Sequence, residues 1–163
     1  MDYRFREVNQ NDGQQVIDIF NFYIENSFAA YLDEKLSYDK FQPLVALSKG
    51  YPFYVIEDGL NGVIGFGFLG KYHPSITFNR VAELTYFILP AHTQKGLGTQ
   101  LLHVLSTEAK KLGIDTLLAN INGLNQVSLS FHLAQGFAEC GRFMRIGKKQ
   151  NTDFDVVWMQ KFI

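Results

Sequence analysis

One feature of the sequence restricts the fold most. It is an apolar strand that leads through a Gly-x-Gly turn into the strongest helix pattern of the chain. Residues 80–89 form the longest strand candidate, Pro90 ends it, and residues 93–99 follow as the turn. Apolar residues then recur at helical spacing, at Leu97, Leu101, Leu105, Ala109 and Leu112. A buried-type strand at 116–121 completes a β-α-β crossover, so we expect a sheet with a helix packed on it.

The glycine turn is suited to binding an anion. The first-turn N–H groups of a helix lack internal partners, and the helix dipole adds partial positive charge there. Gly96 and Gly98 let a large anion approach the backbone, and Lys95 adds a charge. A phosphate or pyrophosphate therefore fits, although a tight turn without a ligand fits the spacing equally well. The chain has no P-loop string, and Leu101 stands where a dinucleotide fingerprint needs its third glycine.

The other elements predict a sheet flanked by helices on a single domain spanning residues 1–163. Strands are expected at 3–8, 52–57, 63–69, 137–146 and 154–162, and helices near Val16 and after Ser37. Asp12 with Gln15 resembles a capping box for the first of these helices. The order of elements predicts a mixed sheet in an α/β or α+β sandwich.

Three local patterns carry further expectations. Gly65 and Gly67 inside a strand predict close packing against that face. Residues 127–133 alternate with period two, which favours a strand, whereas Asn125 as cap and Gly136 as terminator favour a helix. Lys148 and Lys149 are typical of a solvated turn.

Composition excludes several classes of protein. The chain has 163 residues, 47% of them hydrophobic, and a formal net charge of -1, so a disordered chain and a basic nucleic-acid binder are not supported. No apolar run is long enough for a membrane helix, and no signal stretch opens the chain, so we expect a cytoplasmic protein. The single cysteine, Cys140, and the scattered histidines provide no metal-ligand spacing.

Glu83 is the first candidate for chemistry. Alternation along residues 81–87 puts it on one face of a largely apolar strand. Burying a carboxylate costs free energy unless it is hydrated, paired or used, and desolvation would raise its pKa. Such a group suits a general base, while a solvated glutamate on an exposed strand is the other interpretation.

Several strings together resemble the GCN5-related N-acetyltransferases. Residues 93–98 look like the acetyl-coenzyme A loop [QR]-x-x-G-x-[GA] of that family, with Thr93 in place of Gln or Arg. Further similarity points to the phosphinothricin and methionine sulfoximine acetyltransferase branch. It lies in residues 20–24, in Gly65-Phe66-Gly67-Phe68, in residues 83–88, and in Asn125 with Ser128, His132, Gly136 and Phe137.

The resemblance implies a fold and a cosubstrate. The fold is a mostly antiparallel sheet of six or seven strands, splayed at the cofactor site and flanked by about four helices. Acetyl-coenzyme A would be the cosubstrate, with no metal. The residues implied to bind it are Tyr86, Phe87, Ile88, Thr93, Gln94, Lys95, Gly96, Leu97, Gly98, Thr99, Asn125 and Ser128.

The resemblance also implies direct acetyl transfer to the primary amine of a small, amino-acid-like substrate. Glu83 would take the ammonium proton, and His132 would give a proton to the departing thiolate; a histidine merely packed on its helix fits His132 equally well. The candidate residues for binding the acceptor amine are Phe28, Tyr31, Tyr72, Ser75 and Phe78. Ser75 stands where the branch carries an arginine suited to a substrate carboxylate. The resemblance therefore supports phosphinothricin itself as the substrate less well than it supports another small amine.

Three assignments stay open. The first is a small-molecule N-acetyltransferase, the second a protein or peptide N-acetyltransferase, and the third a non-catalytic acyl-CoA-binding module. The resemblance implies a homodimer, with coenzyme A and an amine as partners and neither nucleic acid nor membrane.

Overall fold

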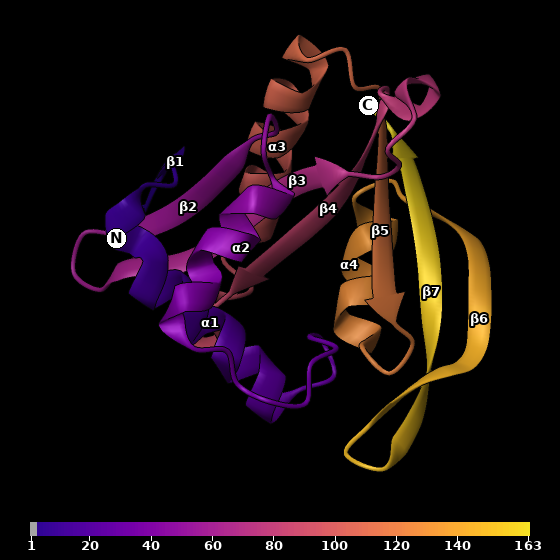
Figure 1. Ribbon diagram of the computed structural model, residues 1–163, viewed down its shortest axis with the longest axis horizontal. Coiled ribbons are helices and arrows are strands. Elements are labelled where there is room, and N and C mark those ends of the chain that lie inside the picture. The colour runs from indigo at the N-terminus through magenta and orange to yellow at the C-terminus, as the bar shows by residue number, and fades with distance from the viewer. Residues whose placement is uncertain (1–2) are drawn as a thin grey trace.

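The computed structural model describes residues 3–163 as a seven-stranded sheet with helices on both faces (Figure 1). Helices α1 (Gly13–Asn26) and α2 (Phe41–Leu47) cover one face, and α3 (Leu97–Lys111) and α4 (Gln126–Ala134) cover the other. The strands are β1 (Tyr3–Glu7), β2 (Phe53–Asp58), β3 (Gly62–Lys71), β4 (Val81–Ile88), β5 (Thr116–Asn122), β6 (Ala138–Lys149) and β7 (Thr152–Phe162).

The sheet has the order β1-β2-β3-β4-β5-β7-β6, and among residues 3–163 only the β4–β5 pair is parallel. This confirms the expected mixed, mostly antiparallel sheet. The parallel pair follows from the β-α-β crossover through α3, whereas the short turns at 59–61 and 150–151 join antiparallel neighbours.

Two apolar clusters fix the helices to the sheet. Leu101 and Leu105 of α3 are fully buried against one face, and Val16 and Ile17 of α1 against the other. The predicted close approach at the strand glycines is present on the α3 face. A Cβ atom built on Gly67 would lie 2.9 Å from Leu101 Cδ2, so a side chain at this position would push α3 away.

The ambiguous segment at 127–133 is helical. Asn125 Oδ1 accepts a hydrogen bond from the N–H of Ser128 at 3.1 Å, and Gly136 beyond the helix has φ +86°. The caps at the two ends outweigh the period-two pattern, because they satisfy backbone groups that the helix cannot pair internally.

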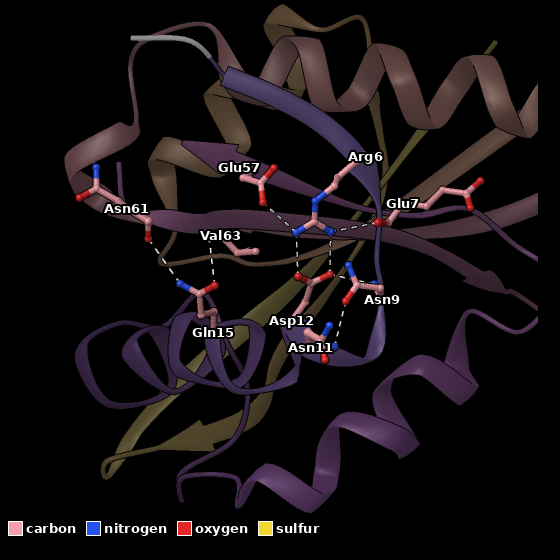
Figure 2. Close-up of polar contacts among 9 residues, drawn as sticks. All are labelled: Arg6, Glu7, Asn9, Asn11, Asp12, Gln15, Glu57, Asn61 and Val63. Carbon is pink, nitrogen blue, oxygen red and sulfur yellow. Dashed lines mark hydrogen bonds and ion pairs between the residues drawn. The ribbon is translucent and has the colours of Figure 1, made fainter. Parts of the chain in front are cut away.

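The start of α1 differs from the expected capping box. The box is formed one turn earlier, by Asn9 and Asp12 around a short 3-10 helix, and Asp12 makes no side-chain cap to α1 itself (Figure 2). Arg6 instead binds both carboxylate oxygens of Asp12 at 2.8 Å, and also reaches Glu57 at 3.1 Å. Burial acts to raise the pKa of Asp12, but the hydrogen bonds from Arg6 and Asn9 outweigh it and hold that pKa below its usual value.

Gln15 also has a different role from the one expected. Its side chain accepts from the N–H of Val63 at 3.2 Å and donates to the carbonyl of Asn61 at 3.4 Å (Figure 2). The first turn of α1 is thereby joined to the β2–β3 hairpin as well as to β1.

The expectation of a solvated turn at Lys148 and Lys149 is wrong about the turn and about Lys149, whereas Lys148 is exposed as expected. Both residues belong to β6, and Lys149 is 1% exposed. Its ammonium donates to the carbonyls of Ser27 at 2.8 Å and Ala30 at 2.7 Å, which joins the β6–β7 hairpin to the loop after α1. Of the helices in residues 3–163, none has the length and apolarity to cross a membrane.

Candidate active site

The centre of the sheet is open on one side of β4. Pairing with β5 covers only Val81–Glu83 opposite Thr116–Leu118, whereas β5 pairs with β7 along its whole length. From Leu84 onward the two parallel strands therefore diverge, as Figure 1 shows. The resulting gap lies at the place where the resemblance implied a splayed sheet.

The peptide groups that face this gap follow from the hydrogen-bond alternation of β4. The N–H of Leu89 donates to Ile64 of β3 at 2.9 Å, and the carbonyl of Arg80 accepts from Thr116 at the β5 side. Alternation then directs the peptide groups of Tyr86 and Ile88 toward the gap and that of Phe87 toward β3. The hydroxyl of Tyr23 donates to the Ile88 carbonyl, so this edge offers mainly the Tyr86 peptide and the Ile88 N–H.

The glycine turn lies next to the end of β4 and begins α3. Gly96 is the N-cap with φ +77°, and no side chain caps the helix. Gln94 is also left-handed, with φ +59°, and the turn residues from Thr93 to Gly96 are exposed. The first-turn N–H groups of a 15-residue helix are therefore available to an anion.

Gly98 and Thr93 have structural reasons of their own. A Cβ atom on Gly98 would lie 3.2 Å from the Phe131 ring, so this glycine lets α4 pack close to the start of α3. The Thr93 hydroxyl donates to the carbonyl of Pro90 at 2.8 Å and helps to close the turn. The side chain that departs from the resembled motif thus turns back onto its own loop.

Glu83 lies at the last paired position of β4, on the α1 face. Phe87, four residues further along the strand and on the same face, packs against Phe20 of α1 with ring centroids 5.0 Å apart. The Glu83 carboxylate is half-buried and accepts from Asn120 Nδ2 of β5 at 3.4 Å. Desolvation raises the pKa of Glu83 above its ordinary value of 4.5, which gives the carboxylate the basicity expected of a proton acceptor.

His132 lies on the opposite face, in α4, and is 3% exposed. Its Nδ1 is 2.7 Å from the carbonyl of Ser128, which can only accept, so we assign the ring proton to Nδ1. Nε2 then accepts from the hydroxyl of Tyr86 at 2.8 Å. Burial lowers the pKa of His132, so the ring is neutral at pH 7 and both nitrogens are engaged.

The five candidate residues for binding the acceptor amine fall into two groups at opposite ends of the sheet (Figure 1). Phe28 and Tyr31 lie in the loop after α1, where Tyr31 stacks on Phe154 of β7 at 5.6 Å. Burial raises the pKa of the Tyr31 hydroxyl to about 12. This end is joined to the β6–β7 hairpin.

The second group is in the β3–β4 loop. Tyr72 contacts Phe78 with ring centroids 5.8 Å apart. Ser75 caps a short 3-10 helix, and its hydroxyl accepts from the N–H of Thr77. Ser75 therefore stabilises the loop in the position where the resembled branch has an arginine, and no described contact brings this group to Tyr31.

Two neighbours of the site were missed from the sequence. Asn120 was not singled out, because its contact with Glu83 depends on which strand lies beside β4. Tyr23 was not assigned either, since its bond to Ile88 spans 65 positions. The alternation of residues 116–122 does put Asn120 on one face of a strand, and this was the available signal.

The sequence profile of the acetyltransferase (GNAT) family matches residues 16–137, which contain the glycine turn, Glu83 and His132. The chain belongs to the acetyltransferase (GNAT) family. The matched region ends before β6 and β7, so the hairpin that contacts the loop after α1 lies outside it.

Relatives in the family agree with this assignment. An L-methionine sulfoximine/L-methionine sulfone acetyltransferase from Pseudomonas paraeruginosa is 30% identical over 112 residues, 69% of this chain and 65% of that protein. The match thus spans slightly less than two thirds of the relative.

Two solved structures share the complete fold. A ribosomal-protein-alanine N-acetyltransferase from Brucella melitensis superposes with a TM-score of 0.91 at 26% identity, covering 98% of this chain and 99% of that one. An acetyltransferase structure from Salmonella typhimurium, solved with its cofactor acetyl-CoA, gives 0.88 at 26% identity, with coverage of 98% and 93%.

Proposed function

We propose that this protein is an acetyl-CoA-dependent N-acetyltransferase that acts on the primary amine of a small, amino-acid-like substrate. The observation that carries the proposal is the gap between β4 and β5. It has a half-buried carboxylate of raised pKa on one face and an uncapped helix N-terminus beside it. The transfer is direct, in a ternary complex, without an acyl-enzyme intermediate and without a metal. Cys140 is exposed on β6, three strands away from the strand that carries Glu83, so it does not serve as an acyl-carrying nucleophile in this proposal.

The cosubstrate fits the groups that this chain offers. The N–H groups of the turn from Thr93 to Thr99 suit the pyrophosphate, and Lys95 adds charge. The Tyr86 and Ile88 peptides suit the amide groups of the pantetheine arm, with Asn125 and Ser128 across the gap. Acetyl-CoA supplies the acetyl group as an activated thioester.

Glu83 acts as the general base. An alkyl ammonium has a pKa near 10 and is mostly protonated at pH 7, so it must lose a proton before its nitrogen attacks the acetyl carbon. The carboxylate accepts this proton directly or through a water molecule. Asn120, hydrogen-bonded to the same carboxylate, orients it.

The departing thiolate takes up one proton, which balances the proton that the ammonium gives to Glu83. A neutral His132 has no proton to spare for it, and the one hydroxyl proton of Tyr86 is donated to His132 Nε2, so solvent water supplies the proton and the pair positions this side of the site. His132 holds that hydroxyl in place through Nε2, while the Ser128 carbonyl fixes its tautomer.

The Pseudomonas paraeruginosa relative supports an amino-acid-like acceptor, because its name specifies L-methionine sulfoximine and L-methionine sulfone. The Brucella melitensis neighbour supports the alternative of a protein amine, because its name specifies an alanine of a ribosomal protein. The two differ in size of acceptor, so kinetics with free amino acids and with peptides distinguish them.

The protein acts as a cytoplasmic homodimer in this proposal. The edge strand β6 exposes Phe143, Met144 and Ile146, which are 54%, 69% and 60% accessible. Apolar side chains on an edge strand favour association with a second copy over a bare monomer.

The test is free-thiol release from acetyl-CoA over a panel of amines. The panel contains L-methionine sulfoximine, L-methionine sulfone, phosphinothricin, polyamines and short peptides. Turnover of the amino-acid compounds is expected. Turnover of peptides alone would instead establish the alternative, and acetyl-CoA binding without thiol release on any amine would indicate a non-catalytic module.

A further inference from the structure

Asn122, the last residue of β5, has a buried amide nitrogen with no hydrogen-bond partner. The residue is 1% exposed, and its Nδ2 is the one buried side-chain polar atom without a partner among residues 3–163. Its Oδ1 accepts from the N–H of Leu124 at 2.9 Å, which fixes the orientation of the carboxamide. The unsatisfied atom is therefore the donor, and leaving it so costs free energy.

The face of β5 that carries Asn122 is the face of the proposed base. Asn120 and Asn122 are two positions apart, so their side chains project from the same side of the strand. Asn120 contacts the Glu83 carboxylate at 3.4 Å. The Cα atoms of the two asparagines are about 6.6 Å apart along the strand. The glycine turn and Phe131 lie on the opposite face.

This spacing matches an acceptor that carries an oxygen two or three bonds from its amine. With the amine beside Glu83, a carboxylate on the adjacent carbon extends along β5 toward Asn122. No charged side chain is needed for one such contact, because an N–H donor pairs well with an anionic oxygen. Ser75, by contrast, is occupied by its own turn.

We infer that Asn122 donates a hydrogen bond from Nδ2 to the carboxylate of an α-amino-acid acceptor. The inference rests on the proposed function and adds a residue that selects the acceptor. It gives the buried donor the partner that the protein alone does not provide.

The experiment combines one substitution with two acceptors. In Asn122→Ser the hydroxyl can still accept from the N–H of Leu124, while the shorter side chain no longer extends an N–H donor toward the substrate carboxylate. The acceptors are L-methionine sulfone and its decarboxylated analogue, 3-(methylsulfonyl)propylamine, each measured with saturating acetyl-CoA. Asn61→Ser, in the β2–β3 turn, is the matched control for the same change at a distant site.

The expected result is a fall of about 10-fold or more in kcat/KM for L-methionine sulfone in Asn122→Ser. The decarboxylated amine should change less than about twofold, as should the KM for acetyl-CoA, because neither uses this donor. Asn122→Asp, which keeps the size and the bond to Leu124, should show the same selective loss if the serine variant folds poorly.

Equal losses on both acceptors, or no loss on either, would overturn the inference, since a structural role or a buried water does not distinguish acceptors. Wild-type turnover of the amine but not of the amino acid would also overturn it and leave acetyl transfer intact. Thermal stabilisation by L-methionine sulfone with coenzyme A gives a readout without turnover. Stabilisation of the wild type but not of Asn122→Ser would support the inference even if the proposed catalysis failed.

Discussion

The Glu83 carboxylate should control the pH dependence of the reaction. Replacement by glutamine removes the proton acceptor, so kcat should fall by about 100-fold or more. In the wild type, activity should be lost as the pH falls through a pKa raised above 4.5, because protonation removes the base. Full pH profiles of kcat/KM for both proteins test this. Retention of the wild-type kcat by Glu83→Gln from pH 6 to 9 would exclude Glu83 as the base.

His132 should make the folded protein sensitive to mild acid. Its folded-state pKa is lowered below the ordinary 6.5, so protons bind the unfolded chain more readily. The resulting stability is present in full above pH 6.5 and decreases as the pH falls below it. The drop in melting temperature between pH 7.5 and pH 5.5 should therefore be smaller in His132→Gln than in the wild type. An unchanged drop would mean that the ring is already solvated.

At the scale of elements, the two ends of α3 provide a matched comparison. Gly96 and Gly113 have φ +77° and +78°, and a Cβ atom on Gly113 meets nothing within 4 Å. Alanine at either position should cost about 1–2 kcal/mol of folding free energy. Only Gly96→Ala should also raise the KM for acetyl-CoA, because Gly96 belongs to the turn that we propose binds the pyrophosphate and Gly113 does not. Equal KM values for acetyl-CoA in the two variants would show that the turn at Gly96 does not bind the cosubstrate.

The attachment of α1 to the sheet depends on Asp12. Its side chain is 5% exposed and receives two bonds from Arg6, so Asp12→Asn should destabilise the protein by about 2 kcal/mol. The pKa of Asp12 is lowered, so the contribution is present above its usual value and is lost as the pH falls through the folded-state value. Urea denaturation at pH 7 and pH 3 measures both effects. A difference between the two proteins that persists unchanged at pH 3 would contradict the assignment.

At the scale of the whole molecule, the fold was largely predictable and the acceptor side was not. Strand and helix periods, Gly-x-Gly and the caps are local signals, and they define the β4–α3 unit and α4. The Glu83–Asn120 contact and the burial of Lys149 depend on partners that are distant in sequence. Lys149 was expected at the surface because lysine is nearly always exposed, and nothing adjacent to it in sequence predicts the carbonyls of Ser27 and Ala30.

The exposed side chains of β6 lead to a prediction about assembly. Phe143→Glu puts a charge into the apolar edge, so it should convert a dimer of 18.6 kDa chains into monomers without unfolding them. Sedimentation at micromolar concentration, with circular dichroism as the check on folding, tests this. A wild type that already sediments as a monomer would contradict the proposed dimer.

The short β4–β5 contact also has a mechanical consequence. Four strands lie on one side of it and three on the other. Strand pairing joins the two blocks at Val81–Glu83 and their partners, next to the Arg80 carbonyl that accepts from Asp115 and Thr116. A ligand that pairs with Tyr86 and Ile88 would act as an additional strand wedged into a seam. Binding of the ligand would then stiffen the β4–β5 seam. The slowing of amide hydrogen exchange would be concentrated along these two strands instead of being spread over the sheet.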